Sequence, residues 1–403
     1  MKKKVLIIFK YPHEWNADIT DKFSNYYDTE FLYISYFKNR NFTEIVNDIN
    51  NLIKSKNIEI VVFDSGYLKF INLFFIERIN TKKKVLLTSD NFHLHELNSI
   101  SANGCDLVLC GDPFQTLRYM EKGYEAFTLL HTQHHLHSSH YNDNADSKPS
   151  EINKNNNKKK EIDVLFFGHL TPDRMDILHY IAKEGILLKN VGHEGISGIP
   201  QDELWELISK SKIVINLSKS RTTVVQNYAS ENVFKFYYQL KGRILLAGFH
   251  ETTCVSEYSP GKELLFTEDE VPTFFTKEEC VEILKKLLKN EELLAKYTKK
   301  LTLKVKDLCD DKKSFEPIYN AIEKLNHRKV ELIKIPYWYL RIGAKQILLR
   351  NIKLSTLMKA IFQFGIIFKI IKNSSILTKL FIVIESVVNI LWYSAIYTFK
   401  SKK

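Results

Sequence analysis

The first candidate for chemistry is the end of the apolar run "DVLFFG", which is typical of a β-strand that stops at Gly168. A glycine at a strand end lets the backbone approach a ligand closely, because no side chain stands in the way. The helix expected next has free backbone N–H groups in its first turn that can bind phosphate, and Arg174 adds a guanidinium that can hold the same anion. The alternative is an ordinary strand–turn–helix corner with a solvated Arg174.

Two further apolar runs in the same half of the chain end on polar residues. "KIVINLS" contains Asn216, with Lys219 and Arg221 just after it, and these could form a second edge of the same anion site. The stretch 241–261, "KGRILLAGFHETTCVSEYSPG", contains Arg243 and Glu257. An arginine and a carboxylate placed in this way can bracket a diphosphate and the hydroxyls of a sugar, although each pattern alone is also compatible with a plain strand cap. The candidate ligand-binding residues of this half are Gly168, Arg174, Asn216, Arg243, Glu257, Tyr258 and Ser259.

Several other ligand motifs are absent from the sequence. It has no GxxxxGK[ST] phosphate loop and no GxGxxG after a strand. The stretch 131–140, "HTQHHLHSSH", contains five histidines, but their spacing fits neither HExxH nor a Cys/His zinc site. We therefore expect exposed loop histidines there, and no bound metal or other cofactor.

Short apolar runs alternate with stretches of helical spacing, which is typical of parallel sheets covered by helices on both faces. The sequence predicts one such domain at residues 1–135 and a second at 162–325. Residues 136–161 are polar and low in complexity, so they are expected to form a linker or a long exposed loop. The predicted fold class is α/β, with two Rossmann-like parallel-sheet domains facing a cleft, since ligands bind outside the carboxyl ends of parallel strands.

The elements that position the candidate residues are predicted from the same runs. In the first domain, strands are expected at 5–9, 58–64, 84–90 and 105–112, with a helix at 42–56. In the second domain, strands are expected at 162–168, 212–218, 243–248 and 252–257. Helices are expected at 173–185, within 277–301, and at 315–325.

The positive charge of the chain is concentrated at its end. The formal net charge is +11, and residues 337–403 hold eleven Lys/Arg and one acid, a net of +10, which leaves +1 for the rest. A nearly neutral body argues against a protein that binds nucleic acid. The five cysteines are scattered and odd in number, which indicates reduced thiols in a cytosolic protein. The N-terminal apolar run, Val5 to Phe9, is too short for a signal peptide.

The tail, residues 337–403, is basic, aromatic and apolar at once, and we expect it to form helices that lie on an anionic membrane surface. Two alternatives remain open. The run Leu380–Phe399 is long enough to span a bilayer, although Glu385 and Asn389 weaken that interpretation. The tail could also bind a protein or mediate oligomerisation, and the sequence does not give the oligomeric state.

Four motifs, in this order, resemble the bacterial "glycosyl transferases group 1" family, which has the two-domain GT-B fold. They are "CDLVLCGDPFQTLRYMEKGYEAFTLL" (105–130), "DVLFFGHLTPDR" (163–174), "INLSKS" (215–220) and "KGRILLAGFHETTCVSEYSPGKELLF" (241–266). The resemblance implies that the second domain holds a nucleotide-sugar donor near Gly168, Arg174, Asn216, Arg243 and Glu257. It also implies that the acceptor lies against the first domain. Many relatives have an acid three residues after the arginine, followed by a glycine, and here those positions hold Leu246 and Glu251.

The resemblance implies a transferase that stabilises the departing diphosphate with Arg/Lys and helix N–H groups, and therefore needs no metal. Retention or inversion cannot be inferred from the sequence. An inverting enzyme needs a base from the first domain, and the candidates are Asp90 and His93, with Asp64 as a third. These residues are also compatible with a strand cap and loop histidines.

The expected function is transfer of a sugar, in the manner of a hexosyltransferase, to a surface-polysaccharide, lipopolysaccharide or lipid-linked glycan acceptor. The enzyme is expected in the cytoplasm, peripheral on the inner face of the cytoplasmic membrane. The alternative is a degenerate GT-B scaffold that binds a glycan or a protein partner without catalysis, which Leu246 and Glu251 favour.

Overall fold

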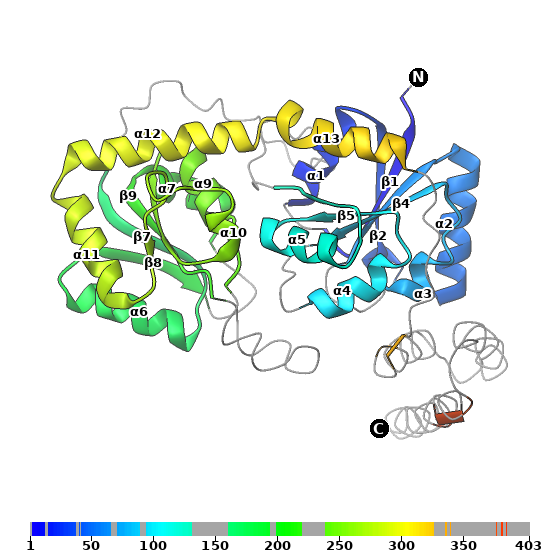
Figure 1. Cartoon of the computed structure of the whole chain (residues 1–403), viewed down its shortest axis with the longest axis horizontal. Coiled ribbons are helices and arrows are strands. Elements are labelled where there is room, and N and C mark those ends of the chain that lie inside the picture. The colour runs from blue at the N-terminus through cyan, green and yellow to red at the C-terminus, as the bar shows by residue number, and fades with distance from the viewer. Residues whose placement is uncertain are drawn as a thin grey trace, which may run out of the picture.

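The computed structural model contains two parallel α/β sheets, each covered by helices on both faces (Figure 1). It describes residues 2–12, 15–37, 40, 42–65, 71–88, 94–130, 160–193, 199–219, 238–325, 335–336, 339, 376, 380–381 and 384. The predicted fold class is confirmed. The His-rich stretch and most of the predicted linker lie outside the described residues, so those predictions stay predictions.

The first domain is built on a six-stranded sheet of order β2-β1-β3-β4-β5-β6, and every strand pair in it is parallel. Its strands are β1 (Lys4–Phe9), β2 (Asp28–Tyr33), β3 (Ile60–Asp64), β4 (Lys83–Thr88), β5 (Leu107–Cys110) and β6 (Ala126–Thr128). Its helices are α1 (Trp15–Ser24), α2 (Phe42–Lys56), α3 (Leu73–Ile76), α4 (His95–Ala102) and α5 (Pro113–Glu121), with a 3-10 turn at Ile34–Tyr36. The four strands predicted for this domain are all present.

The second domain is built on a five-stranded parallel sheet of order β11-β10-β9-β7-β8. Its strands are β7 (Ile162–His169), β8 (Leu188–His193), β9 (Ser211–Asn216), β10 (Thr253–Glu257) and β11 (Thr273–Phe274). Its helices are α6 (Pro172–Lys183), α7 (Gln201–Ser209), α9 (Arg243–Phe249), α10 (Pro260–Glu263), α11 (Lys277–Leu288) and α12 (Glu291–Leu308). Alternate strand residues face opposite layers: Val164 and Phe166 pack with α6 and α11, whereas Leu165 and Phe167 pack with α9 and α12.

The strand predicted at 243–248 is wrong, because these residues form the helix α9. A short run that is apolar after its first residue, Arg243, has no period that separates a buried strand from a buried helix. Residues 243 to 248 are all buried, and a Cβ on Gly248 would lie 2.5 Å from Val305 of α12. The close contact between α9 and α12 therefore requires this glycine.

The helix predicted at 315–325 is present as α13 (Asp311–Lys324), but it packs on the first domain. Phe315, Ile318 and Ile322 lie in the core beneath β1, and the ring of Phe315 meets Phe23 of α1 at 4.9 Å. The chain therefore returns to the first domain after completing the second, and Figure 1 shows α12 and α13 running across both. By its contacts, the segment after 310 belongs with residues 1–130 rather than with the domain predicted at 162–325.

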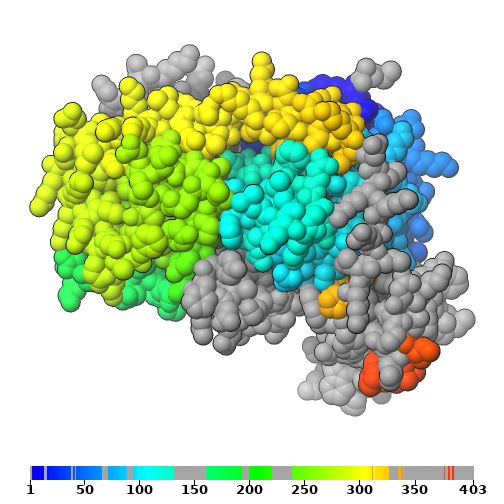
Figure 2. All heavy atoms as spheres, in the orientation of Figure 1, coloured from blue at the N-terminus to red at the C-terminus, as the bar shows by residue number. Residues whose placement is uncertain are grey.

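The two domains also contact each other away from the segment α12–α13, where the chain returns to the first domain. Helices α5 and α10 are in contact, and Figure 2 shows the surfaces of the two domains touching at this level. Asp112, just after β5, accepts a hydrogen bond of 2.9 Å from the backbone N–H of Leu240 in the second domain. Because all strands in each sheet are parallel, this contact brings the carboxyl ends of both sheets to the same interface, as the sequence predicted.

Part of the predicted tail is anchored in the first domain. The Tyr339 side chain is buried, and its hydroxyl accepts a hydrogen bond from Leu73 N and contacts Ser101 Oγ. Ile335 packs against the same core. Among the residues that the structure describes, no helix combines the length and apolar character needed to cross a bilayer.

His95, at the start of α4, is a buried histidine that stays neutral. Its ring packs on Tyr119 at 4.6 Å, and neither ring nitrogen has a hydrogen-bond partner among the described residues. Burial lowers its pKa to about 3, with smaller contributions from the positive charges of Arg118 and Lys122. As the pH falls below about 6.5, His95 is therefore protonated in the unfolded chain but stays neutral in the folded protein.

We expect His95→Phe to flatten the pH dependence of stability. In the native chain, the unfolding free energy should fall by up to about 1.4 kcal/mol per pH unit from this histidine as pH drops below about 6.5. The variant lacks that proton uptake and keeps the aromatic contact with Tyr119. Urea unfolding at pH 7 and pH 5 measures the difference, and an unchanged slope in the variant would contradict a neutral buried His95.

Candidate functional site

The candidate residues of the second domain converge on one edge of its sheet. Strands β10, β9 and β7 are adjacent and parallel, so Glu257, Asn216 and Gly168 lie at the same carboxyl edge. Arg243 and Arg174 reach this edge from the first turns of α9 and α6. The structure thus brings together residues that are up to 90 positions apart in the sequence.

The Arg243 guanidinium lies under this edge and is bonded to the ends of two strands. Its Nε donates to the carbonyl of Phe167 at 2.6 Å, and one terminal nitrogen donates to Asn216 Oδ1 and the Leu217 carbonyl. Gly168 packs directly on the guanidinium and has a φ of +108°, so a Cβ there would overlap Arg243. The glycine is therefore needed for a close contact with Arg243.

Arg174 makes a similar set of backbone contacts. Its two terminal nitrogens donate to the carbonyls of His169, Leu217 and Lys219 at 2.6, 3.1 and 2.8 Å. Asn216 is fully buried, and its amide donates to Ser256 Oγ at 2.8 Å. The side chains of Arg174, Arg243 and Asn216 together fix the ends of β7 and β9, and all three are buried.

Glu257 closes the same network from β10. Its carboxylate accepts hydrogen bonds from the backbone N–H of Lys219 at 2.9 Å and from Ser218 Oγ at 3.4 Å. Burial raises the pKa of Glu257, although these hydrogen bonds and the positive charge of Arg174 oppose the shift. The acid that the sequence places at the rim is thus largely enclosed, and it fixes the position of Lys219.

The accessible part of the rim consists of a cation and two aromatic rings. The Lys219 ammonium forms an ion pair with Asp173 in the first turn of α6, which raises the pKa of Lys219. The Tyr258 ring stacks on Phe275 at 5.0 Å, and Phe275 is 69% exposed. A cation beside a helix N-terminus suits an anion, and an exposed aromatic face suits a planar ring.

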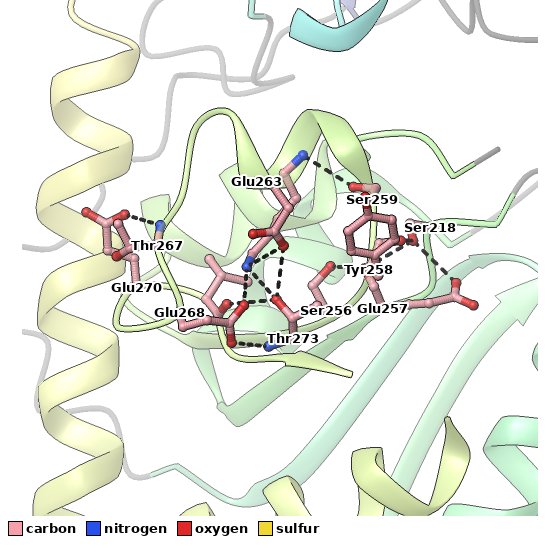
Figure 3. A network of polar contacts seen from close by, with 12 residues as sticks. Ser218, Ser256, Glu257, Tyr258, Ser259, Glu263, Thr267, Glu268, Glu270 and Thr273 are labelled. Atoms are coloured by element: carbon pink, nitrogen blue, oxygen red, sulfur yellow. Dashed lines mark hydrogen bonds and ion pairs between the residues drawn. The ribbon is translucent and has the colours of Figure 1, made fainter. Parts of the chain in front are cut away.

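Ser259 and the residues after it form a separate structural network (Figure 3). Ser259 is fully buried, and its hydroxyl accepts a hydrogen bond from Lys262 N as the N-cap of α10. The fully buried Lys262 ammonium binds Glu263 at 3.0 Å and Glu268 at 2.7 Å, and it also donates to Thr273 Oγ1. This network ties α10 to β11 and so holds the backbone that carries Glu257 and Tyr258.

The remaining sequence candidates have different outcomes. Asp90 and His93 lie outside the described residues, so their roles stay predictions. Asp64 is buried at the carboxyl end of β3, in the middle of the first sheet. Leu246 is buried in the core between α9 and α12, and Glu251 lies before the amino end of β10, with its carboxylate 3.8 Å from Lys306. Neither Leu246 nor Glu251 therefore lies with the other candidates.

Sequence reasoning noted Lys219 beside the strand end at Asn216 but did not single it out, and it missed Phe275. Lys219 carries the partly exposed charge of this edge, and its signal was its position three residues after Asn216. Phe275 follows the very short strand β11, and no periodicity marks it. In the part of the chain that the structure describes, no three His, Cys, Asp or Glu side chains gather in a way that could hold a metal ion.

Comparisons with known proteins agree with the fold and with the matched motifs. Residues 157–307 match the family model described as "Glycosyl transferase-like", which confirms the resemblance over the second domain. The solved structure of HepE from Anabaena with UDP and glucose matches with a TM-score of 0.52 and 11% identity, over 80% of this chain and 100% of HepE. The complex of HepE with UDP-glucose gives 0.51 and 12% over the same shares. The architecture is GT-B, and no curated protein matches the chain.

We expect Gly168→Ala to cost more stability than Gly185→Ala. Both glycines have a positive φ, +108° and +80°, so both variants pay for a strained backbone, about 1 kcal/mol. A Cβ on Gly185 has no atom within 4 Å, whereas a Cβ on Gly168 overlaps Arg243. Thermal unfolding measures both variants. An equal loss of stability in the two variants would show that Gly168 is required only for its backbone conformation, and that the contact with Arg243 does not require a glycine.

Proposed function

We propose that this protein is a glycosyltransferase that takes a sugar from a nucleotide-sugar donor bound at the carboxyl edge of the second sheet. The observation that carries the proposal is the position of the candidate residues. They lie on one edge of the very domain that matches the glycosyl transferase-like model. The GT-B fold supports it, because HepE, which shares this fold, has been solved with UDP-glucose.

In this proposal the accessible groups of the edge contact the donor. Lys219 exchanges Asp173 for a phosphate oxygen, and the first turn of α6 adds the backbone N–H of Asp173, since Pro172 has none and that of Arg174 is bonded to Thr171. Gly168 lets the Arg243 guanidinium lie against the strand end beneath the ligand, and Tyr258 with Phe275 offers a face for the planar base. The buried guanidinium groups of Arg174 and Arg243 hold the carbonyl ends of the strands in place beneath the ligand.

The chemistry proposed for this edge is stabilisation of the leaving diphosphate. As the bond to the sugar breaks, negative charge grows on the diphosphate oxygen, and Lys219 and the backbone N–H of Asp173 are placed to stabilise it. No step of this kind requires a metal ion. If the enzyme inverts, the acceptor hydroxyl loses its proton to a base of the first domain, with Asp90, His93 and Asp64 as candidates.

The second candidate function is a GT-B scaffold that binds a glycan or protein without catalysis. The observation that favours it is the enclosure of the polar candidates. Leu246 is part of the core, and Glu257 is turned toward the Lys219 backbone. A scaffold of this kind would retain the network and lose the donor.

We expect calorimetry with a panel of UDP-, GDP- and CMP-sugars to show sub-millimolar binding of one nucleotide. Lys219→Met should weaken that binding about 10- to 100-fold, the usual effect of removing a charged hydrogen bond. Lys212→Met is the matched control, because Lys212 lies at the amino end of the same strand. It is also paired with an aspartate, Asp163, at 2.7 Å.

Two results would decide against the proposal. If no nucleotide binds below millimolar concentration, the scaffold function is favoured. If Lys219→Met and Lys212→Met weaken binding equally, Lys219 is not a donor contact. Transfer to cell-surface glycans in a strain that carries the Lys219 variant then separates binding from catalysis.

We further propose that the tail docks the enzyme on the inner face of the cytoplasmic membrane, where a polysaccharide, lipopolysaccharide or lipid-linked acceptor would be met. Ile376, Leu380 and Ile384 are helical and at least half exposed, and their spacing of four residues puts them on one face. An exposed apolar stripe in a strongly basic segment fits an anionic lipid surface.

We expect the full chain to float with liposomes that contain anionic lipid, and a chain without residues 345–403 to remain in solution. This boundary keeps Tyr339, whose contacts in the first domain would be lost by a cut at 337. Replacing Ile376, Leu380 and Ile384 by serine separates the apolar contribution from the charge. Equal flotation of the full and shortened chains would contradict membrane docking.

A further inference from the structure

Asp112 has two tasks at the interface between the domains. It is the N-cap of α5, where its Oδ1 accepts hydrogen bonds from Phe114 N at 2.8 Å and Gln115 N at 3.2 Å. Pro113 occupies the first helical position, which completes an ordinary helix start. This local role uses only one oxygen of the carboxylate.

The second oxygen of Asp112 bonds to the other domain. Its Oδ2 accepts the backbone N–H of Leu240 at 2.9 Å. Leu240 lies three residues before Arg243, whose guanidinium holds the ends of β7 and β9. One carboxylate of the first domain is therefore bonded to the segment that leads directly into the candidate donor edge.

Gly261 of α10 packs on the same carboxylate from a third direction. A Cβ on Gly261 would lie 2.8 Å from Oδ1 and 2.9 Å from Oδ2, which is closer than real Cβ contacts. Gly261 lies three positions after Tyr258 and two after Ser259. The two segments that border the donor edge, 238–243 and 258–262, thus both meet at Asp112.

The burial of Asp112 makes this contact costly to open. The residue is 2% exposed, and burial raises its pKa, while hydrogen bonds from Leu240, Gln115 and Phe114 and the positive charge of Lys241 oppose that shift. A buried carboxylate that loses one of its partners is left partly unsatisfied, which penalises a change in the relative position of the domains.

We propose that Asp112 is a positioning residue that fixes the donor edge of the second domain against the carboxyl edge of the first. It acts through Leu240 and Gly261 and touches no substrate. Its effect on the reaction rests on the proposed function, whereas its effect on the domain contact does not. In the proposed transferase the donor lies on one side of this contact and the acceptor on the other, so the contact sets their separation.

Asp112→Asn tests the contact while retaining a good helix cap. Asparagine caps helices as well as aspartate does, but its amide has one oxygen where the carboxylate has two. With the oxygen on Phe114 and Gln115, an NH₂ group faces the N–H of Leu240, and the bond between the domains is lost. Asp310→Asn is the control, because Asp310 caps α13 through Lys313 N at the other chain crossing.

Hydrogen exchange of the Leu240 amide is the first readout, and it needs no substrate. We expect on the order of tenfold faster exchange in Asp112→Asn, and unchanged exchange in Asp310→Asn. Gly261→Ala reaches the same contact from the second domain, and it should also speed exchange at Leu240. If neither variant changes this exchange relative to Asp310→Asn, the proposal is overturned.

Steady-state kinetics on the full chain is the second readout. Because every proposed donor contact lies within the second domain, Asp112→Asn should leave the KM for the donor nearly unchanged. It should lower kcat on the order of 10- to 100-fold through misplacement of the acceptor. A rise in KM with unchanged kcat would assign Asp112 to donor binding instead. Faster exchange at Leu240 without any transferase activity in the native chain would leave the contact established and reject the proposed function.

Discussion

The site depends on the Arg243 guanidinium beneath the ends of β7 and β9. Carbonyl groups just beyond the carboxyl ends of parallel strands have no neighbouring strand to bond with. Arg243 bonds to one of them, at Leu217, and to the Phe167 carbonyl near the end of β7, and it binds the Asn216 side chain as well. The conformation of Gly168 and the burial of Asn216 follow from this arrangement. The polar edge is consequently rigid before any ligand arrives, which is the condition for electrostatic stabilisation of a transition state.

The central strands could be predicted from the sequence because they are uniformly apolar, whereas the mixed edge strands β2 (DTEFLY) and β8 (LKNVGH) could not. Runs such as "VLIIF" and "IVVFD" lie between helices on both faces, and this burial makes them continuous rather than alternating. The same uniformity caused the error at 243–248. The helix α9 is buried on all sides, so its residues show no amphipathic period. The feature that this helix requires is the close packing of Gly248 against Val305 of α12, which the sequence pattern does not show.

The candidate site could be located from the sequence, but the direction of its side chains could not. Strand ends are recognisable, and parallel strands place them on one edge, so Gly168, Asn216 and Glu257 were found together. The sequence contains no sign that Arg174 and Arg243 point at backbone carbonyls. Their direction depends on where the neighbouring strands end relative to one another, which is set by the register of the sheet. Ser259 is different: the Ser-Pro pair is a helix-start pattern, and it marks a cap from sequence alone.

The return of the chain to the first domain has a consequence for synthesis on the ribosome. The core under β1 includes Phe315, Ile318 and Ile322, and the opposite core includes Tyr339. These side chains emerge only after the whole second domain has been translated. The second domain, whose core residues end at Val305, can close as a unit as soon as it leaves the exit tunnel. The usual order, in which N-terminal domains fold first, would then be reversed. The first domain would wait with part of its apolar surface uncovered, and chaperones would have most reason to bind there.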